Sequence, residues 1–378
     1  MKNLYLTFLI FFSIFKLSAQ NEFIIKDVKL FDGENTIDKT SVWVKDKLII
    51  QVSDNIQISE DIEAIDGKNK TLIPALSNAH VHAWSSASLN QAAKAGVLNV
   101  MDMHGIETFQ QNMRNLKDST NYARYYVAGF AATVPNGHGT QFGFAVPTLV
   151  KPESAKKFIN NRKKSNVDYI KIIVEPSMET LSIETTAELI KEAHIHNLKA
   201  VVHVSRLEDA IEVIKKNADG LVHLWWDKVI SQEKLKQLKH NHDFFVIPTL
   251  LTTLRAFNNL GEKLQNQLTE DQLLKEIKKL HDIGIPILAG TDPPNFNINY
   301  GTDLYEELFL FKKAGLSNEE ILKSATINVA RAFDLERTGL IKSGYVADII
   351  LVNGDPINNL EDLKNIDMVW KAGNQVEK

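Results

Sequence analysis

The alternation of short apolar runs with amphipathic stretches is the feature that most constrains the fold of this 378-residue chain. Apolar runs that fit buried strands lie at 97–101, 125–131, 169–174, 200–204, 220–224, 244–249 and 286–291, and one more lies within TLIPALSNAHVHAW at 71–84. Most precede stretches such as RLEDAIEVIKK, in which apolar residues recur at helical spacing. Strands that alternate with helices indicate a parallel sheet, and about eight such units predict an α/β fold of the (β/α)₈ TIM-barrel type. A doubly wound open sheet is the alternative.

The two ends of the chain have a different pattern. Residues 21–71 form short alternating runs broken by Asp-Gly and Gly-Lys turns, which is typical of antiparallel strands, and a similar pattern returns at 340–378. We therefore predict one small β domain, a β-sandwich built from both chain ends, beside a barrel at 72–339.

Residues 1–20 have the composition of a secretory signal peptide. Lys2 precedes an apolar run that ends in small and polar residues. Lys16 interrupts this run too early for a membrane anchor, which needs about 20 apolar residues. We expect an exported protein, periplasmic or secreted, with no membrane span after cleavage.

The charge balance excludes one class of partner. The chain has 43 Lys and Arg residues against 47 Asp and Glu, a formal net charge of −4. Nucleic-acid binding depends on an excess of basic side chains that neutralise phosphates. We therefore expect a small-molecule substrate and no nucleic acid, and the oligomeric state stays open between a monomer and a homo-oligomer. Because cysteine is absent, metal ligands must be His, Asp, Glu or a modified Lys.

Several polar side chains interrupt or close strands that otherwise fit a buried position. They are His80, His82, Lys171, His203, His223 and Asp292. In a parallel barrel the carboxyl ends of the strands meet at one mouth, and residues two apart on a strand point to the same face. Imidazole and carboxylate ligands together suit Zn²⁺ and its first-row neighbours. The sequence therefore predicts a divalent metal site, although the aspartate before Pro293 could instead cap a helix.

Lys171 is unusual in this set because an ammonium group beside cations is repelled and costly to bury. It either faces outward, or its amine has reacted with carbon dioxide to give a carbamate whose two oxygens can bridge two metals. An unmodified Lys171 would leave a site with one metal.

Other side chains are candidates for substrate contact. The glycine-rich loop PNGHGTQFG at 135–143 can approach a ligand closely and carries His138, and Tyr300 follows Asp292 in the chain. His104 ends the strand at 97–101, and the aromatic rings of Trp225 and Trp226 either pack on substrate or fill the rim. The remaining histidines are interpreted as structural: His194, His196, His240, His242 and His281.

The chain resembles the amidohydrolase superfamily, in particular its imidazolonepropionase-like and Xaa-Pro-dipeptidase-like branch. The resemblance rests on the short motifs HVH after LIPALSNA, YIKI and GTD, and on His203 and His223. It also rests on two longer segments, NYGTDLYEELFLFKKAGLSNEEILKSATINVARAFDL and TGLIKSGYVADIILVNGDP. Three segments depart from the usual family pattern. PALSNAHVH lacks a glycine and an acidic residue, which predicts looser support of the first ligands, while IIVEPS and DMHG alter regions that shape the pocket.

The resemblance implies two ions, Zn²⁺ or other first-row divalent metals. His80 and His82 would hold the more buried ion with Asp292, and carboxylated Lys171 would bridge it to a second ion on the two later histidines. A metal-activated hydroxide would attack the scissile carbonyl while Asp292 transfers the proton to the leaving amine. We expect hydrolysis of an amide-type C–N bond in a cyclic amide or dipeptide. A lactonase, esterase or phosphoester hydrolase on the same site and an inactive ligand-binding relic are the alternatives.

Overall fold

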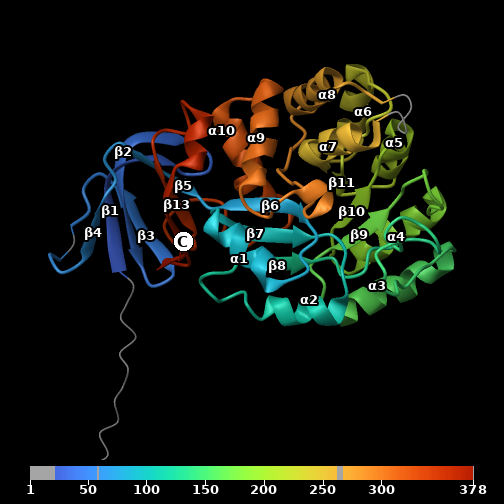
Figure 1. The fold of residues 1–378 in the computed structure, drawn as a ribbon, viewed down its shortest axis with the longest axis horizontal. Helices are drawn as coiled ribbons and strands as arrows, with labels where there is room; N and C mark the ends of the chain where they lie inside the picture. Colours follow the sequence, from blue (N-terminus) through green and yellow to red (C-terminus); the bar gives the residue numbers. More distant parts are fainter. Residues whose placement is uncertain (1–21, 58, 262–266, 378) are drawn as a thin grey trace, which may run out of the picture.

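The computed structural model describes residues 22–57, 59–261 and 267–377. A β-rich part lies beside a larger part in which strands and helices alternate (Figure 1). The signal peptide expected at 1–20 lies outside the described residues. None of the helices in the described ranges combines the length and the hydropathy needed to cross a membrane.

The β-rich part is one mixed sheet made from both ends of the chain. Its eight strands are β1 (Glu22–Phe31), β2 (Thr36–Lys45), β3 (Leu48–Ser53), β4 (Glu63–Asp66), β5 (Lys70–Pro74), β13 (Ile349–Asn353), β14 (Ile366–Lys371) and β15 (Asn374–Gln375). They run in the order β15-β14-β13-β5-β1-β2-β3, with β4 also on β1. Because β5 lies between β1 and β13, the two chain ends share one hydrogen-bonded sheet, and Figure 1 shows β13 beside β5.

The expectation of antiparallel strands at the two chain ends is confirmed for most pairs and wrong for two. β1 pairs in parallel with β4 and with β5, whereas β13 pairs antiparallel with β5, from Ile349 opposite Pro74 to Asn353 opposite Lys70. The reason is that the chain returns after β3 and runs along β1 in the same direction before it enters the larger part. The domain boundaries at 71/72 and 339/340 stay a prediction.

The larger part contains two parallel sheets. One has the order β6 (Leu76–Val81), β7 (Val97–Asp102), β8 (Arg124–Val127), and the other has β12 (Phe245–Ile247), β11 (Gly220–Val222), β10 (Ala200–His203), β9 (Ile170–Ile173). Seven of the expected strands are therefore present. The helices are α1 (Ser86–Lys94), α2 (Glu107–Arg114), α3 (Ala155–Lys164), α4 (Ile183–Ile195), α5 (Leu207–Lys215), α6 (Gln232–Asn241), α7 (Leu250–Leu260), α8 (Glu270–Asp282), α9 (Asp303–Lys313), α10 (Asn318–Ser324) and α11 (Ile327–Ala332), with 3₁₀ turns η1 (Pro152–Ser154), η3 (Asn295–Asn297) and η4 (Leu360–Lys364).

The strand expected at 286–291 is an extended segment held by isolated pairs on both sides. A parallel bridge joins Val246 of β12 to Ile287, and the amide of Ala79 in β6 donates to the carbonyl of Ala289 at 2.8 Å. Between β8 and β9, another parallel bridge joins Ala132 to Ile172. These pairs join Ile287 to β12, Ala289 to β6, and Ala132, which follows β8, to β9. They bring the end of 286–291 next to β6.

Helix α8 begins at a local sequence signal. The Thr269 side chain caps the N-terminus of α8 in a reciprocal box with Gln272, and Leu273, Ile277 and Leu280 form its buried face at helical spacing. A separate buried cluster lies among the parallel strands and takes side chains from within or next to each of them, with one more from α11: Ala79, Met101, Met103, Ala128, Tyr169, Val201, Val222, Phe245, Ile247, Leu288 and Val329. Packing therefore fixes the strand ends relative to one another.

Candidate metal centre and active site

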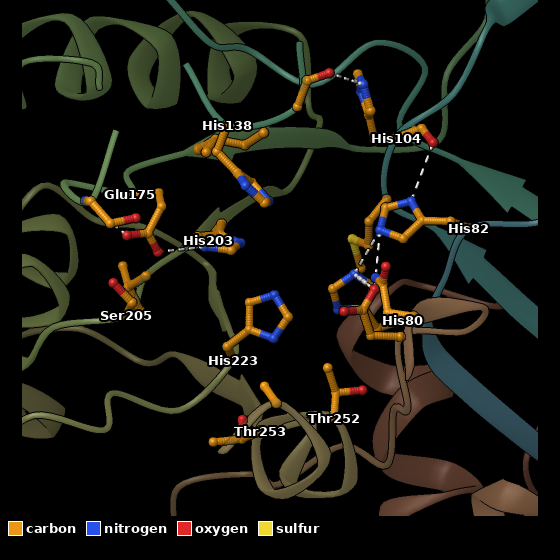
Figure 2. A pocket seen from close by; sticks show the side chains of 18 of the residues that line it. His80, His82, His104, His138, Glu175, His203, Ser205, His223, Thr252 and Thr253 are labelled. Atoms are coloured by element: carbon orange, nitrogen blue, oxygen red, sulfur yellow. Dashed lines mark hydrogen bonds and ion pairs between the residues drawn. The ribbon is translucent and has the colours of Figure 1, made fainter. Parts of the chain in front are cut away.

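The side chains predicted as metal ligands line a single pocket at the carboxyl ends of the parallel strands. The pocket has a volume of about 350 Å³, and its wall includes His80, His82, Lys171, His203, His223 and Asp292. Figure 2 shows the two later histidines facing the two earlier ones across the pocket. The tertiary structure thus brings together residues from β6, β9, β10, the end of β11 and the end of 286–291.

Three donor atoms form a compact group on one side of this pocket. His80 Nε2 and His82 Nε2 are each 3.2 Å from Asp292 Oδ1, and the two nitrogens are 3.3 Å apart. Two donors bound about 2.0 Å from one tetrahedral ion lie about 3.3 Å apart, so this spacing fits a shared Zn²⁺. Asp292 Oδ1 is buried and accepts no hydrogen bond from the described residues. A buried oxygen without a donor is the expected state of a metal ligand whose ion is removed.

Backbone contacts position these donors. Asp292 has φ +56°, in the left-handed region that residues other than glycine rarely adopt, and its amide donates to the His80 carbonyl at 2.8 Å. Asn78 accepts the amide hydrogens of His80 and Thr291 and donates to the Thr291 hydroxyl. The Asn78 amide group thus makes three hydrogen bonds that support the segments carrying the first ligands. The looser support expected for PALSNAHVH stays a prediction.

The second pair of histidines is held by its outer ring nitrogens. His223 Nδ1 is 2.6 Å from Thr249 Oγ1, and His203 Nε2 is 3.2 Å from Glu175 Oε2. The ring centroids of His203 and His223 are 4.5 Å apart. Partners of this kind orient a ligating imidazole and leave its other nitrogen for the metal.

Lys171 lies within β9 with a side chain that is almost completely buried. It forms no ion pair with any residue in the described part of the chain. Burial lowers the pKa of Lys171 to about 7, although the charge of Asp292 acts in the opposite direction. The uncharged amine, which is the form that reacts with carbon dioxide, is therefore well populated at neutral pH.

The surroundings keep most imidazoles in the uncharged form that binds metals. Burial holds the pKa of both His80 and His223 well below the usual value. The second cause is the charge of Lys171 in the case of His80 and the charge of His203 in the case of His223. Burial also acts to lower the pKa of His82, but the close contact with the Asp292 carboxylate and its negative charge outweigh burial and raise that pKa. Neutral imidazole is the ligand form, so the pocket favours metal binding at neutral pH.

A match to the Amidohydrolase family covers residues 71–376. The chain belongs to this family. This match confirms the prediction that the chain is a hydrolase acting on carbon–nitrogen bonds. The predicted similarity to imidazolonepropionases and Xaa-Pro dipeptidases is also confirmed.

Similar proteins cover nearly the whole length of this amidohydrolase. A 5-methylthioadenosine/S-adenosylhomocysteine deaminase of Pyrococcus furiosus is 25% identical, over 86% of this chain and 84% of its own. An imidazolonepropionase of Picrophilus torridus is 23% identical, over 87% and 90%. A Xaa-Pro dipeptidase with bound methionine matches with a TM-score of 0.80 at 21% identity, over 94% of this chain and all of that one. At this identity the structural match shows the fold alone.

The residues predicted to contact substrate lie in different places. His138 lines the pocket, with its ring centroid 4.9 Å from that of His203. Tyr300 lies behind the pocket wall, and its hydroxyl donates to the His82 carbonyl at 2.6 Å. Trp226 is part of the wall, whereas Trp225 is buried and its indole donates to Glu276. Of the two alternatives for these tryptophans, Trp225 therefore fills the rim. Trp226 lies on the pocket wall, where a ligand can contact it.

The remaining histidines separate into one pocket residue and a background group. His104 lines the pocket, but its Nε2 contacts the Gly139 carbonyl at 3.0 Å and its Nδ1 accepts the amide hydrogen of Ala131. Both ring nitrogens are therefore used within the protein. None of the five histidines interpreted as structural is part of the described pocket wall.

Two acidic residues near the site were not singled out from the sequence. Glu175 lines the pocket and contacts His203, and its sequence signals are its position two residues after β9 and its place in the IIVEPS segment. Glu307 on α9 is fully buried and accepts the first amide hydrogens of α7, from Leu250 and Leu251. Because Thr249 immediately precedes these residues, Glu307 supports the segment that holds His223. A lone glutamate inside an amphipathic helix gives no sequence signal of this role.

Proposed function

We propose that this amidohydrolase uses divalent metal to cleave an amide-type C–N bond in a small molecule, with a cyclic amide or a dipeptide as the substrate type. The observation that carries the proposal is the group of three donor atoms that lie 3.2–3.3 Å from one another, one of which is a buried carboxylate oxygen without a hydrogen bond. The same pocket contains a buried lysine without an ion-pair partner among the described residues. A structural role for these side chains would pair the lysine and the carboxylate oxygen.

The residues present fit two first-row divalent ions, with Zn²⁺ as the first choice. His80, His82 and Asp292 would hold one ion, and the second would lie with His203 and His223. When bound, such ions lower the pKa of a coordinated water towards ~7 and polarise a carbonyl oxygen. Thr249 and Glu175 keep the second pair of imidazoles in orientation.

Lys171 is proposed to carry a carbamate. Its amine is buried among metal-binding side chains, is largely uncharged near neutral pH, and has no acidic partner in the described residues. Addition of carbon dioxide converts this amine into an anionic oxygen donor, which removes the repulsion between a lysine and nearby cations.

The other roles belong to side chains of the pocket wall. Asp292 is placed to take a proton from the attacking water and to return it to the leaving nitrogen, because its carboxylate lies on the pocket wall beside the proposed ligands His80 and His82. Burial is the main cause that lowers the pKa of His138 to about 3, so this imidazole is neutral. On the pocket wall it can donate a hydrogen bond to substrate or accept one from it.

The proposal also includes the closed barrel and the export of the protein. The pairs at Ala132, Ile172, Val246, Ile287 and Ala289 support closure of the two parallel sheets and segment 286–291 into one eight-stranded barrel. The composition of residues 1–20 supports a cleaved signal peptide and a periplasmic or secreted location. A small-molecule substrate without a nucleic-acid partner agrees with the size of the pocket.

The test has two parts. Metal analysis of the purified protein should give a metal-to-protein ratio near two, and chelation should stop turnover that Zn²⁺ then restores. The metal-loaded enzyme is screened against N-acyl amino acids, dipeptides and cyclic amides, with lactones, a phosphoester and 5-methylthioadenosine as comparison arms. Preference for a lactone or phosphoester would replace the amidase proposal, and ammonia release from the adenosine derivative would favour the deaminase reaction named for the relatives. No turnover of any arm would favour a ligand-binding relic.

A further inference from the structure

The pocket wall has an unbalanced set of charges. Among its described residues, Lys171 is the only lysine or arginine, and Glu175 and Asp292 are the acidic side chains. The proposed metal site uses Lys171 and Asp292 as ligands, whereas Glu175 contacts the ligand His203 and is the charged residue of the described wall that is not itself a proposed ligand. In Figure 2 it lies on the far side of His203 from His80 and His82.

Glu175 is fixed in this place by the turn that follows β9. Its Oε1 accepts the amide hydrogen of Ser177 at 3.0 Å, and its own amide donates to the Thr180 hydroxyl at 2.8 Å. Its other oxygen, Oε2, is 3.2 Å from His203 Nε2. The turn therefore presents a carboxylate, and a negatively charged substrate group beside it would be repelled.

A nearby cation is turned away from the pocket. Arg255 directly precedes the wall residue Ala256, but its Nη1 is 3.2 Å from Asp303 and donates to the Phe296 carbonyl. Its charge is thus neutralised outside the wall. Recognition of a carboxylate usually employs a free arginine fork or a lysine, which the described wall does not offer.

Aromatic rings from four separate segments make up much of the remaining wall. They are Phe142, Trp226, Phe257 and Phe296. Trp226 and Phe257 pack edge to face with ring centroids 6.0 Å apart, and Phe142 on the 135–143 loop is 43% exposed. Exposed aromatic faces around a pocket provide contact area for a flat apolar group.

We propose that the amide substrate carries an aromatic group and no carboxylate, so that it is uncharged or cationic next to Glu175. This inference rests on the proposed hydrolase function and narrows its substrate class. Among the substrate types of the preceding section, it favours neutral or amidated aromatic amides over free dipeptides and N-acyl amino acids.

The test compares two substrates of the same shape and different charge. Acetate release from N-acetylphenylalaninamide and N-acetylphenylalanine is measured with the Zn²⁺-loaded enzyme, with N-acetylalaninamide as the arm without a ring. We expect kcat/KM for the aromatic amide to exceed both other values by at least about tenfold. If none of the three is cleaved, their binding to the loaded enzyme is measured by calorimetry, and the same order is expected. Equal values, or a preference for the carboxylate, would overturn the inference.

A matched pair of variants then examines the cause. Ser177 is an exposed residue of the wall beside Glu175. Ser177→Lys places a cation next to that carboxylate and should lower the preference for the amide by at least about threefold, because it supplies the missing partner for a substrate carboxylate. Ser177→Met has a similar length without charge and should keep the wild-type ratio. An unchanged ratio in Ser177→Lys would refute the role of charge, whereas an enzyme inactive on the whole screening panel would refute the hydrolase proposal instead.

Discussion

Replacement of Lys171 by methionine should stabilise the metal-free protein. The same substitution should prevent the metal-loaded protein from binding the second ion. The Lys171 pKa of about 7 in the folded chain lies far below the ordinary lysine value of 10.5. Below about pH 7 the Lys171 amine is protonated in both the folded and the unfolded state, so the folded state bears the full free-energy cost of burying that charge. Between about pH 7 and about pH 10.5 only the unfolded state keeps the proton, so the free energy of unfolding rises with pH in this window.

The size of the effect follows from the two pKa values. At neutral pH the cost is about 4 kcal/mol, and at about pH 9 it has fallen to about 2 kcal/mol. Methionine has a similar length and no charge, so Lys171→Met should gain about these amounts relative to the metal-free wild type. This gain at a residue of the pocket wall indicates that the lysine is present for function at a cost in stability.

The assay is urea unfolding of both proteins after chelation, in buffer freed of carbon dioxide, at neutral pH and at about pH 9. Lys157→Met, a change at an exposed position of α3, is the matched control and should alter stability little at either pH. With metal added, Lys171→Met should bind fewer ions than wild type and lose turnover. The reasoning is refuted if the metal-free variant is no more stable than wild type, or if its advantage does not shrink at the higher pH.

Three further substitutions test Asp292 as the proton carrier, Glu307 as a buried acid and Tyr300 as a support of the first metal ligands. Asp292→Asn should lower kcat by about 10²- to 10⁴-fold with an unchanged circular dichroism spectrum, and near wild-type turnover would contradict its role. Burial raises the pKa of Glu307 to about 8, so the folded wild type retains a proton that the unfolded chain releases from about pH 4.5, and stability falls as pH rises between these values. Urea unfolding should show a smaller fall for Glu307→Gln than for wild type, and equal slopes would contradict this. Tyr300→Phe removes the hydrogen bond to the His82 carbonyl and should cost about 1 kcal/mol in the free energy of unfolding; a loss of turnover as large as that of Asp292→Asn would instead indicate a direct part in the reaction.

The sequence predicted those parts of the site that depend on local pattern. The spacing of apolar residues marks the strands, and a polar side chain at a strand end is visible in one dimension, which is why His80, His82, His203 and Asp292 could be proposed together. Their convergence also follows from a general rule, because parallel strands place their carboxyl ends at one edge. The same reasoning was less successful for β1, whose parallel pairing with β4 and β5 depends on where the chain returns, which local alternation does not encode.

The contacts around the predicted ligands were decided only by the tertiary structure. Glu175 meets His203 because neighbouring strands β9 and β10 pair in register, and Glu307 reaches α7 because α9 packs beside it. Tyr300 follows Asp292 closely in the chain, yet its hydroxyl donates to the carbonyl of His82, just after β6. The sequence alone thus determined which chemical groups this protein can bring to a metal, since residue type and strand period are local properties. Which atoms hold those groups in place, and which charge faces the substrate, depends on distances between segments far apart in the chain, and only packing sets these distances.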